Sequence, residues 1–365
     1  MLATALFAPA AEARKKAIWG PIVFVNGQGG CTQATKCSAF PTYDALGVDF
    51  FQFQIRWNEI AKCRPTNPRN HADPCYDWPS ISRVGRTADT IGFAVLESRK
   101  FGMKPVALVR GTPGWANGGR REFWAPNRNA DYANFLIAAS RRYPAIKFWF
   151  IWGETNRPEL FQPGGRRAPK RYAKLVKAAY PALKSVSRAN IVIGGMTYNG
   201  GVPSVPKFIK NFKLKRTKKQ KKRGIPAKPP KLDFFGHNPF DRRVPRLKDK
   251  IIGKPFRGLN DVDTLNKEIK RAYRTRKKKP KIWVAEWTTQ SDHASLAFKF
   301  FVSRAEQARR VRLAYKLVRS VKYVKALAWF TLLDDAPNTR LNGTFGLAEF
   351  DGDRKPSFSA YAAQP

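Results

Sequence analysis

Several kinds of segment are missing from the 365-residue sequence, and each absence argues against a class of protein. No apolar run reaches the roughly 18 residues that a membrane-spanning helix needs, so we expect no transmembrane segment. The sequence has no C-x2-C pair of the type that binds structural zinc, and no other cluster suggests a required metal. It also lacks the Gly-rich turn of dinucleotide-binding folds. We therefore expect no metal and no cofactor.

Acidic residues are scarce, with 26 Asp and Glu against 69 Lys and Arg, a formal net charge of +43. Such a field attracts polyanions: nucleic acids, teichoic or uronic polymers, or an anionic membrane surface. Residues 207–231 contain twelve Lys or Arg and no acid. A block of this kind is more often a solvated loop than a specific site. We expect it to tether the protein to an anionic cell-envelope polymer, and we expect no specific nucleic acid.

The four cysteines all lie in the first fifth of the chain, behind an apolar, small-residue-rich start at 1–13. That start resembles the back half of a secretory signal peptide, although no basic region precedes it. The even number and close spacing favour two local disulfides, Cys31–Cys37 and Cys63–Cys75, among three pairings. A zinc site is the rival interpretation. A secreted protein, extracellular or associated with the cell envelope, is expected.

Two apolar segments each end in a glutamate. Residues 148–152 are aromatic or β-branched without alternation, and Glu154 follows them; residues 281–287 repeat the pattern around Glu286. Strands that are apolar on both faces belong inside a covered parallel sheet. Because active sites of α/β enzymes lie at the carboxyl ends of such strands, the two glutamates are predicted to be a catalytic pair. Surface or structural carboxylates are the alternative.

The whole pattern predicts an α/β protein with a single (β/α)8 barrel, and a doubly wound sheet is the alternative. Its eight strands are expected at 22–25, 49–57, 105–109, 148–152, 191–196, 232–235, 281–287 and 326–333, with helices at 84–95, 131–142, 172–179, 262–276 and 311–318. Residues 1–17 are interpreted as a signal-peptide remnant and basic lead-in, and 18–365 as the barrel domain. The basic insertion at 207–231 lies between strands five and six.

Several motifs, in order, resemble those of clan A glycoside hydrolases, which are TIM barrels. They are Thr112-Pro-Gly-Trp115-Ala116, Ile151-Trp-Gly-Glu154-Thr-Asn156, Asp233-Phe-Phe-Gly-His237 and Trp283-Val-Ala-Glu286, with Trp329 on strand eight. The resemblance, to cellulase-like family 5 and to family 39 enzymes, covers nearly everything from Ile18 onward. It implies a retaining glycosidase acting on an oligo- or polysaccharide. Glu286 would be the nucleophile and Glu154 the acid/base, with carboxyl groups about 5–5.5 Å apart.

The sequence departs from the clan at two positions. The residue before the acid/base is usually an Asn that binds the sugar 2-hydroxyl, and here it is Gly153. Strand two usually ends with an Arg near the nucleophile, and here Gln52 stands at that spacing, with Arg56 four residues later. Hydrogen bonds to the 2-hydroxyl strengthen in the transition state and supply several kcal/mol. These departures motivate an alternative function, a weak or inactive barrel that binds a glycan or polyanion.

Four further residues are predicted to bind substrate. His237 is predicted to orient Glu286 or to contact the sugar. The alternative is a buried histidine with a purely structural role. Trp115 and Trp329 are predicted to stack on sugar rings. The alternative is that both only fill the hydrophobic core. Asn156 is predicted to position Glu154. The alternative is that it only caps the following turn.

Overall fold

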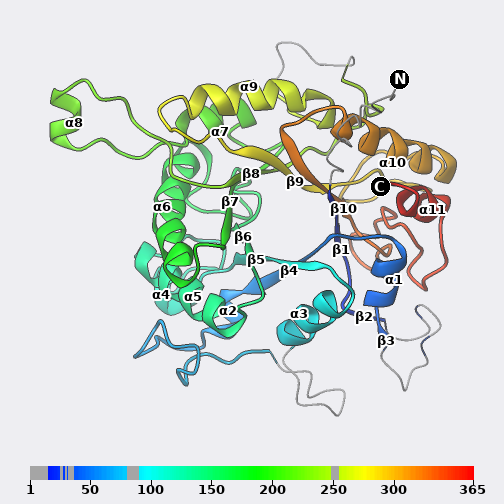
Figure 1. Cartoon of the computed structure of the whole chain (residues 1–365), viewed down its shortest axis with the longest axis horizontal. Coiled ribbons are helices and arrows are strands. Elements are labelled where there is room, and N and C mark those ends of the chain that lie inside the picture. Colours follow the sequence, from blue (N-terminus) through cyan, green and yellow to red (C-terminus); the bar gives the residue numbers. More distant parts are fainter. Residues whose placement is uncertain (1–14, 25–27, 29–30, 32–36, 80–89, 248–254) are drawn as a thin grey trace, which may run out of the picture.

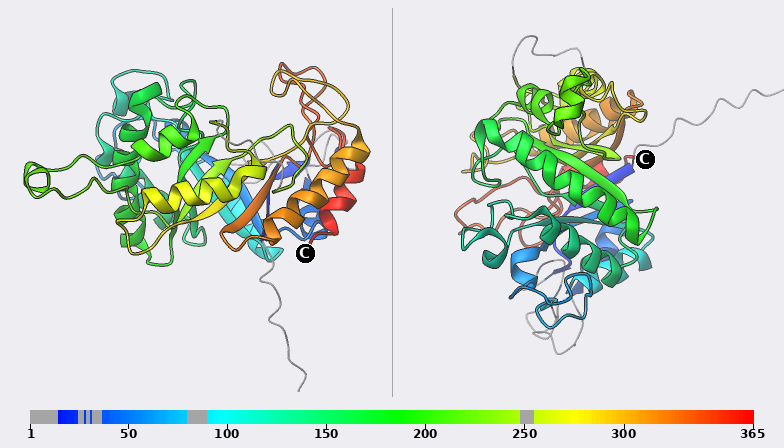
Figure 2. Two further views of the ribbon diagram at one scale, coloured as in Figure 1. Left: turned by 90° about the horizontal axis from the view of Figure 1, so that it is seen from above. Right: turned by 90° about the vertical axis from the view of Figure 1, so that its left-hand side faces the viewer.

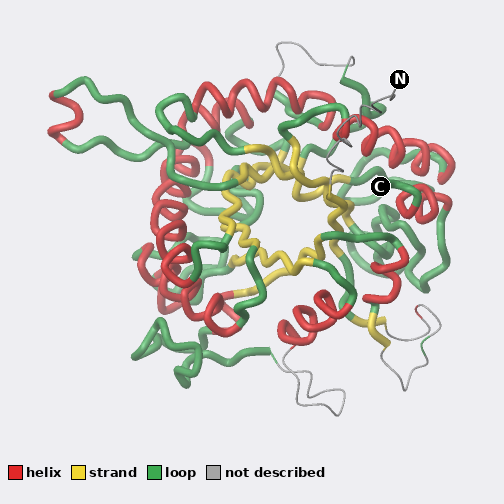
Figure 3. Tube along the Cα trace, in the orientation of Figure 1, coloured by secondary structure: helices red, strands yellow, loops and turns green. Residues whose placement is uncertain are grey.

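The computed structural model describes residues 15–24, 28, 31, 37–79, 90–247 and 255–365. Eight parallel strands close into a barrel in the order β1-β10-β9-β8-β7-β6-β5-β4, visible as the central ring in Figure 3. The strands are β1 Lys15–Trp19, β4 Phe50–Arg56, β5 Lys104–Arg110, β6 Phe148–Ile151, β7 Ile191–Tyr198, β8 Phe234–Asn238, β9 Lys281–Trp287 and β10 Val324–Phe330. The predicted (β/α)8 barrel is confirmed.

Helices surround the barrel (Figure 1). They are α1 Phe40–Ala45, α2 Trp57–Ile60, α3 Thr90–Lys100, α4 Gly114–Asn117, α5 Asn129–Arg142, α6 Ala168–Val186, α7 Val205–Asn211, α8 Lys218–Lys222, α9 Val262–Ala272, α10 Arg304–Arg319 and α11 Pro356–Ala362, with short 3-10 turns η3 Gly165–Arg167 and η4 Leu259–Asp261. The first part of the helix predicted at 84–95 lies outside the described residues. Two short strands, β2 Val23–Phe24 and β3 Cys37–Ser38, pair outside the barrel.

Alternation along the strands divides the core into two layers. Residues that point inward fill the barrel itself: Ala17, Trp19, Phe50, Val106, Leu108, Phe150, Ile193, Met196, Trp283, Ala285, Ala326 and Ala328. The alternate residues pack outward against the helices. Trp283 lies across the interior, with its ring centroid 4.9 Å from that of Phe50 and 5.9 Å from that of Phe150. The barrel interior is therefore filled by side chains.

The first barrel strand was predicted at 22–25, and this was wrong: the strand is β1, which begins at Lys15. Two lysines open β1 and hide its apolar pattern. Lys16 is only 2% exposed, and its ammonium donates to the backbone carbonyl of Gln364 at 2.7 Å, beyond the end of α11. A cation at this place complements the carboxyl end of the helix dipole. Burial lowers the pKa of Lys16 to about 8.

Both predicted disulfides, Cys31–Cys37 and Cys63–Cys75, are present. In the described part of the chain no helix is both long and apolar enough to cross a bilayer.

Candidate active site

Glu154 lies in a sharp turn directly after β6. Trp152 and Glu154 have φ values of 66° and 41°, a region that residues other than glycine rarely adopt. Such conformations cost about 1–3 kcal/mol each and persist only where neighbouring structure holds them. Here the Trp152 amide donates to the Val109 carbonyl at 3.0 Å, and the Thr155 amide to the Met196 carbonyl at 2.7 Å. The flanking strands β5 and β7 thus fix the direction of the Glu154 side chain.

Glu286 reaches the carboxyl end of the barrel through a β-bulge. The pairing of β9 with β10 shifts register between Leu327 and Trp329, so β9 carries one residue more than β10 there. Ala285 belongs to the barrel interior and Trp287 to the outer layer, with Glu286 between them. Without the extra residue, strict alternation would place the carboxylate facing the helices.

Gln52 supports the strand beneath Glu286. Its amide donates to the Ala285 carbonyl at 2.8 Å and accepts from the Trp283 indole at 2.9 Å, and its side chain is fully buried. Gln52 therefore positions β9 beneath Glu286 and supplies no cation. Arg56, at the end of β4, forms an ion pair with Glu59 at 2.5 Å.

The Asn238 side chain lies near both glutamates. Asn238, the last residue of β8, donates from Nδ2 to Glu154 Oε1 at 3.0 Å, and it is close enough to Glu286 to lower the pKa of that carboxyl group. Arg157 donates to the other oxygen of Glu154 at 2.8 Å. The structure therefore brings the two predicted carboxylates together at the same end of the barrel. The Oδ1 of Asn238 is buried and has no hydrogen-bond donor within the described chain.

The pKa of Glu286 is raised well above its usual value, first by burial and then by the negative charge of Glu154. The Asn238 side chain and the charges of Arg157 and Arg110 oppose this shift. Because two nearby carboxylates resist being ionised together, the surroundings of Glu286 favour its protonated form.

Arg110, the last residue of β5, is the cation that the sequence reasoning missed. It lies beside Arg56 in the strand register and makes no hydrogen bond or ion pair among the described residues. Burial and the charge of Arg56 lower its pKa, while Glu122, Glu286 and Glu154 raise it. Its position at the end of a strand could have identified Arg110 in the sequence, because the same criterion identified Glu154 and Glu286.

His237 is fully buried, and both ring nitrogens are engaged. Nε2 lies 2.6 Å from the Arg257 carbonyl, to which it donates, and Nδ1 lies 2.9 Å from both the hydroxyl and the backbone carbonyl of Thr197. Burial lowers the pKa of His237 to about 4, so the ring is neutral. In this state it ties β7 and β8 to the segment before α9. Its role at the sugar stays a prediction.

Trp115 lies on α4, and Asn156 lies in the turn after β6. The Trp115 indole donates to the Ala61 carbonyl at 3.1 Å, and the Arg64 guanidinium lies 5.0 Å over its ring. Asn156 is buried; its amide donates to the Tyr198 carbonyl at 2.9 Å and accepts from the Tyr198 amide at 2.7 Å. Asn156 therefore holds the loop after β7 beside Glu154. A direct contact of either residue with substrate stays a prediction.

Trp329 points away from the barrel axis. Its side chain is 1% exposed and lies in the outer layer, with its ring centroid 5.5 Å from that of Trp287. The next residue, Phe330, packs against the barrel interior. A sugar platform at Trp329, which stays untested, would need this ring to move out of the core, whereas Phe330 already points inward.

A cavity of about 540 Å³ lies beside Tyr198, at the end of β7. Its lining is aromatic and basic and includes Tyr198, Phe240, Phe298, Phe300, Arg242 and Lys299. Arg157, which binds Glu154, also lies 5.0 Å over the Tyr198 ring and so links the cavity to the carboxylate pair. Pockets with aromatic walls and a few polar groups are typical of small-molecule sites. The sequence analysis did not identify this cavity.

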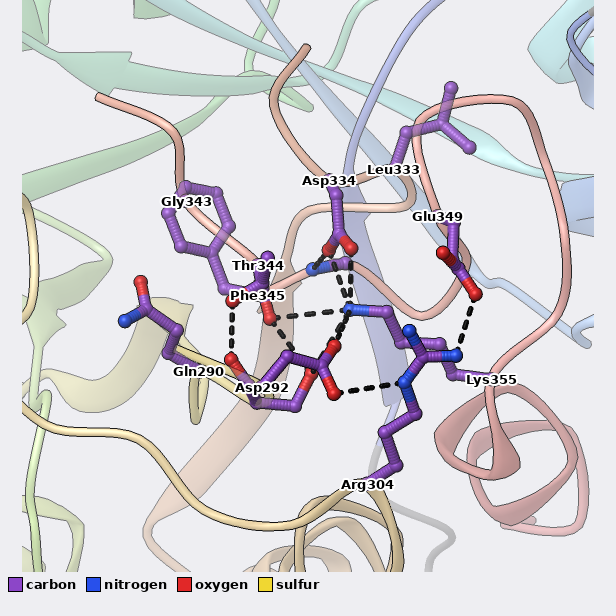
Figure 4. Close-up of polar contacts among 12 residues, drawn as sticks. Gln290, Asp292, Arg304, Leu333, Asp334, Gly343, Thr344, Phe345, Glu349 and Lys355 are labelled. Atoms are coloured by element: carbon purple, nitrogen blue, oxygen red, sulfur yellow. Dashed lines mark hydrogen bonds and ion pairs between the residues drawn. The ribbon is translucent and has the colours of Figure 1, made fainter. Parts of the chain in front are cut away.

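A buried ion network braces the loops that follow β9 and β10 (Figure 4). The Lys355 ammonium is fully buried and lies 2.6 Å from Asp334 and 3.8 Å from Asp292. Arg304 extends the network from Asp292 to Glu349 at the surface. The residues concerned come from distant parts of the chain and hold the carboxyl end of the barrel in shape. Among the described residues no group of three or more His, Cys, Asp or Glu is placed to bind a metal.

No protein-family model and no curated protein matches this sequence. Solved structures do match its fold. A family 39 glycoside hydrolase from the gut symbiont Bacteroides cellulosilyticus has a TM-score of 0.64 at 19% identity, covering 97% of this chain and 64% of that one. A glucosidase from Croceicoccus marinus has a TM-score of 0.64 at 14% identity, covering 96% and 65%. A monomeric beta-xylosidase from Caulobacter crescentus has a TM-score of 0.60 at 18% identity, covering 97% and 68%. The chain thus spans about two thirds of the length of these structures and shares their barrel fold.

Proposed function

We propose that this protein is a secreted retaining glycoside hydrolase that cleaves O-glycosidic bonds with Glu154 and Glu286. The observation that carries the proposal is that Glu154 and Glu286 lie together at the carboxyl end of a parallel barrel, with Asn238 bound to Glu154 and beside Glu286. A pair of carboxyl groups on opposite sides of a glycosidic bond is the usual apparatus of this reaction. The shared fold of the family 39 enzyme gives independent support.

In the proposed reaction Glu286 attacks the anomeric carbon while Glu154 gives its proton to the departing oxygen. Glu154 then takes a proton from the water that attacks the glycosyl–Glu286 ester, which frees Glu286 again. The raised pKa of Glu286 favours a proton on this carboxyl group in the free protein. Substrate binding therefore has to move this proton to Glu154. Arg110 favours that state because its positive charge lowers the pKa of Glu286.

Asn238 offers a hydrogen-bonding group near the cleavage point, where Gly153 has no side chain to provide one. Its Oδ1 is buried without a donor, so it is available to a sugar hydroxyl. The adjoining aromatic cavity, with Tyr198 and Phe298, is suited to stack the next sugar of an oligo- or polysaccharide. Two disulfides fit an oxidising compartment and support secretion.

The test is a screen of aryl glycosides with wild-type protein, followed by azide rescue of two variants. Glu286→Ala should abolish hydrolysis, and azide should then give the glycosyl azide of inverted configuration. Glu154→Ala should retain turnover of substrates with good leaving groups, and azide should give the retained product. If the two outcomes are exchanged, the roles of the glutamates are reversed.

The alternative, a weak or inactive barrel that binds glycans, is favoured by one observation, the missing side chain at Gly153. It predicts saturable glycan binding by wild-type protein and no turnover on any substrate of the screen. Product formation that disappears in Glu286→Ala would exclude it.

A further inference from the structure

The densest positive charge of the molecule lies away from the candidate active site. Residues 207–231 connect β7 to β8 and project sideways from the barrel as an arm that carries α8 (Figures 1 and 2). The arm returns to the barrel at Lys231, directly before β8, and Lys277–Lys279 stand directly before β9. Since both strands are parallel, these segments lie at the amino end of the barrel. Glu154 and Glu286 lie at the opposite end.

Two hollows separate the base of the arm from α9. The first has a volume of about 430 Å³ and the second about 410 Å³, and Thr275 lines both. Their cations are Lys210, Lys213, Arg271 and Arg274 in the first and Lys228, Lys231, Arg276, Lys277 and Lys278 in the second. Together with the lysines of α8, we call this surface the basic face.

The few acids near the basic face are already neutralised. Glu268 lines the first hollow, but both of its oxygens bind Arg257, at 2.5 and 3.0 Å. Asp233, which lies 4.0 Å from Lys278, is paired with Lys184 at 2.9 Å and accepts from the Val192 amide. The field of the basic face is therefore not balanced from within the described chain.

The arm has a defined shape although it is almost entirely basic. The Leu214 amide donates to the Lys228 carbonyl at 2.9 Å at its base, and a Thr217–Gln220 capping box starts α8. Four of the five residues of α8 are lysines, and all four are exposed. Like charges three or four residues apart on a helix repel one another and destabilise it. A bound polyanion would relieve this repulsion.

We propose that the basic face is a binding site for a polysaccharide that carries carboxylate or sulfate groups, separate from the catalytic centre. Lysine predominates on the arm, and lysine attracts anions as a point charge without demanding a particular geometry. The arm also has no exposed ring on which nucleic-acid bases could stack, because its two aromatic residues, Phe208 and Phe212, are buried. These features favour an anionic glycan over a nucleic acid. The proposal does not depend on glycoside hydrolysis.

The test compares three variants of the full chain that each lose four positive charges. The arm variant carries Lys218→Gln, Lys219→Gln, Lys221→Gln and Lys222→Gln. The hollow variant carries four substitutions around the first hollow: Lys210→Gln, Lys213→Gln, Arg271→Gln and Arg274→Gln. The control variant carries four substitutions on α3 and around α10: Arg99→Gln, Arg312→Gln, Lys316→Gln and Lys322→Gln. Matching the charge change separates a local site from attraction by the net charge. Circular dichroism checks that each variant is folded.

Binding of polygalacturonate, heparin, neutral dextran and single-stranded DNA is measured at several salt concentrations. We expect each face variant to bind the two anionic glycans at least tenfold more weakly than the control does, with a smaller salt dependence because fewer ions are released. Dextran should not bind the basic face. Equal losses in the control and face variants would overturn the proposal, as would unchanged glycan binding. DNA that binds more tightly than both glycans and loses affinity only in the face variants would show a nucleic-acid site instead.

Discussion

Replacing Lys355 with methionine tests whether the ion network at the carboxyl end of the barrel stabilises the fold. The Lys355 ammonium is fully buried and contacts Asp334 at 2.6 Å, Ser291 Oγ at 3.1 Å and the Thr344 carbonyl at 3.3 Å. Methionine keeps most of the side-chain volume but leaves the Asp334 carboxylate, itself 8% exposed, without its cation. Removing one partner of a buried pair costs about 3–5 kcal/mol. We expect that decrease in the free energy of unfolding at pH 7, measured by urea denaturation.

The pH dependence of this decrease follows from Asp334. Burial raises its pKa despite the opposing charge of Lys355. A carboxyl group whose folded pKa lies above its unfolded value binds its proton more readily in the folded state, so ionisation above pH 4 works against folding. Without Lys355 that pKa rises further. The difference between wild type and Lys355→Met should therefore shrink as the pH is lowered from 7 towards 4.

Two variants serve as controls. Arg304→Met removes a cation of the same network whose side chain is 41% exposed, and exposed pairs contribute about 0–1 kcal/mol. Adding Asp334→Asn to Lys355→Met should recover most of the stability, since the amide oxygen can still accept from the Gly346 amide at 2.7 Å. A decrease below about 1 kcal/mol in Lys355→Met would refute the reasoning, because the pair would then behave as a surface pair.

Three further predictions concern single sites. Because the pKa of His237 is lowered to about 4, only the unfolded state binds a proton at this side chain between about pH 6.5 and 4, and the free energy of unfolding falls as the pH drops through this range. The variant His237→Gln should remove up to about 3 kcal/mol of this pH dependence, measured by urea denaturation at several pH values. Reducing or mutating Cys63–Cys75 should lower the free energy of unfolding by about 2–3 kcal/mol, whereas an unchanged value would contradict the chain-entropy estimate. Gly153→Asn should raise kcat at least tenfold on substrates with a 2-hydroxyl but not on 2-deoxy analogues, because the new side chain can hydrogen bond to that hydroxyl. A Cβ added at Gly153 would lie 3.4 Å from Leu108, which is an ordinary contact distance. Gly153→Ala is the control.

The sequence predicted the barrel strands well where a glutamate stands at or just after the end of the strand. Strand β9 begins and ends where it was expected, and the segment ending at Glu154 was correctly placed as the fourth barrel strand. The strand β1 was missed because Lys15 and Lys16 interrupt its apolar pattern, and only the packing of the distant α11 explains a buried lysine there. Local pattern cannot reveal a partner that lies hundreds of residues away.

Side-chain direction was harder to predict than strand position. A one-residue bulge in β9 decides that Glu286 turns towards the mouth, and no residue type marks that bulge in the sequence. On β10, Trp329 was predicted to bind a sugar because of its place on strand eight, yet Trp329 packs outward and the next residue, Phe330, points inward. Asn238 was not among the predicted site residues, since an amide acquires its role only from the two carboxylates that the fold brings to it.

The direction of the Glu286 pKa shift shows how local environment can outweigh net charge. In a chain of +43 the average field stabilises carboxylates and should lower their pKa. The pKa of Glu286 is nevertheless raised, because the surrounding protein excludes water and Glu154 adds a second negative charge at short range. The cations of the basic face lie at the other end of the barrel, and charges on the solvent side are screened within about 8 Å at physiological ionic strength. The chain can therefore present a strongly basic surface to a polyanion and still hold a carboxyl group whose pKa is raised.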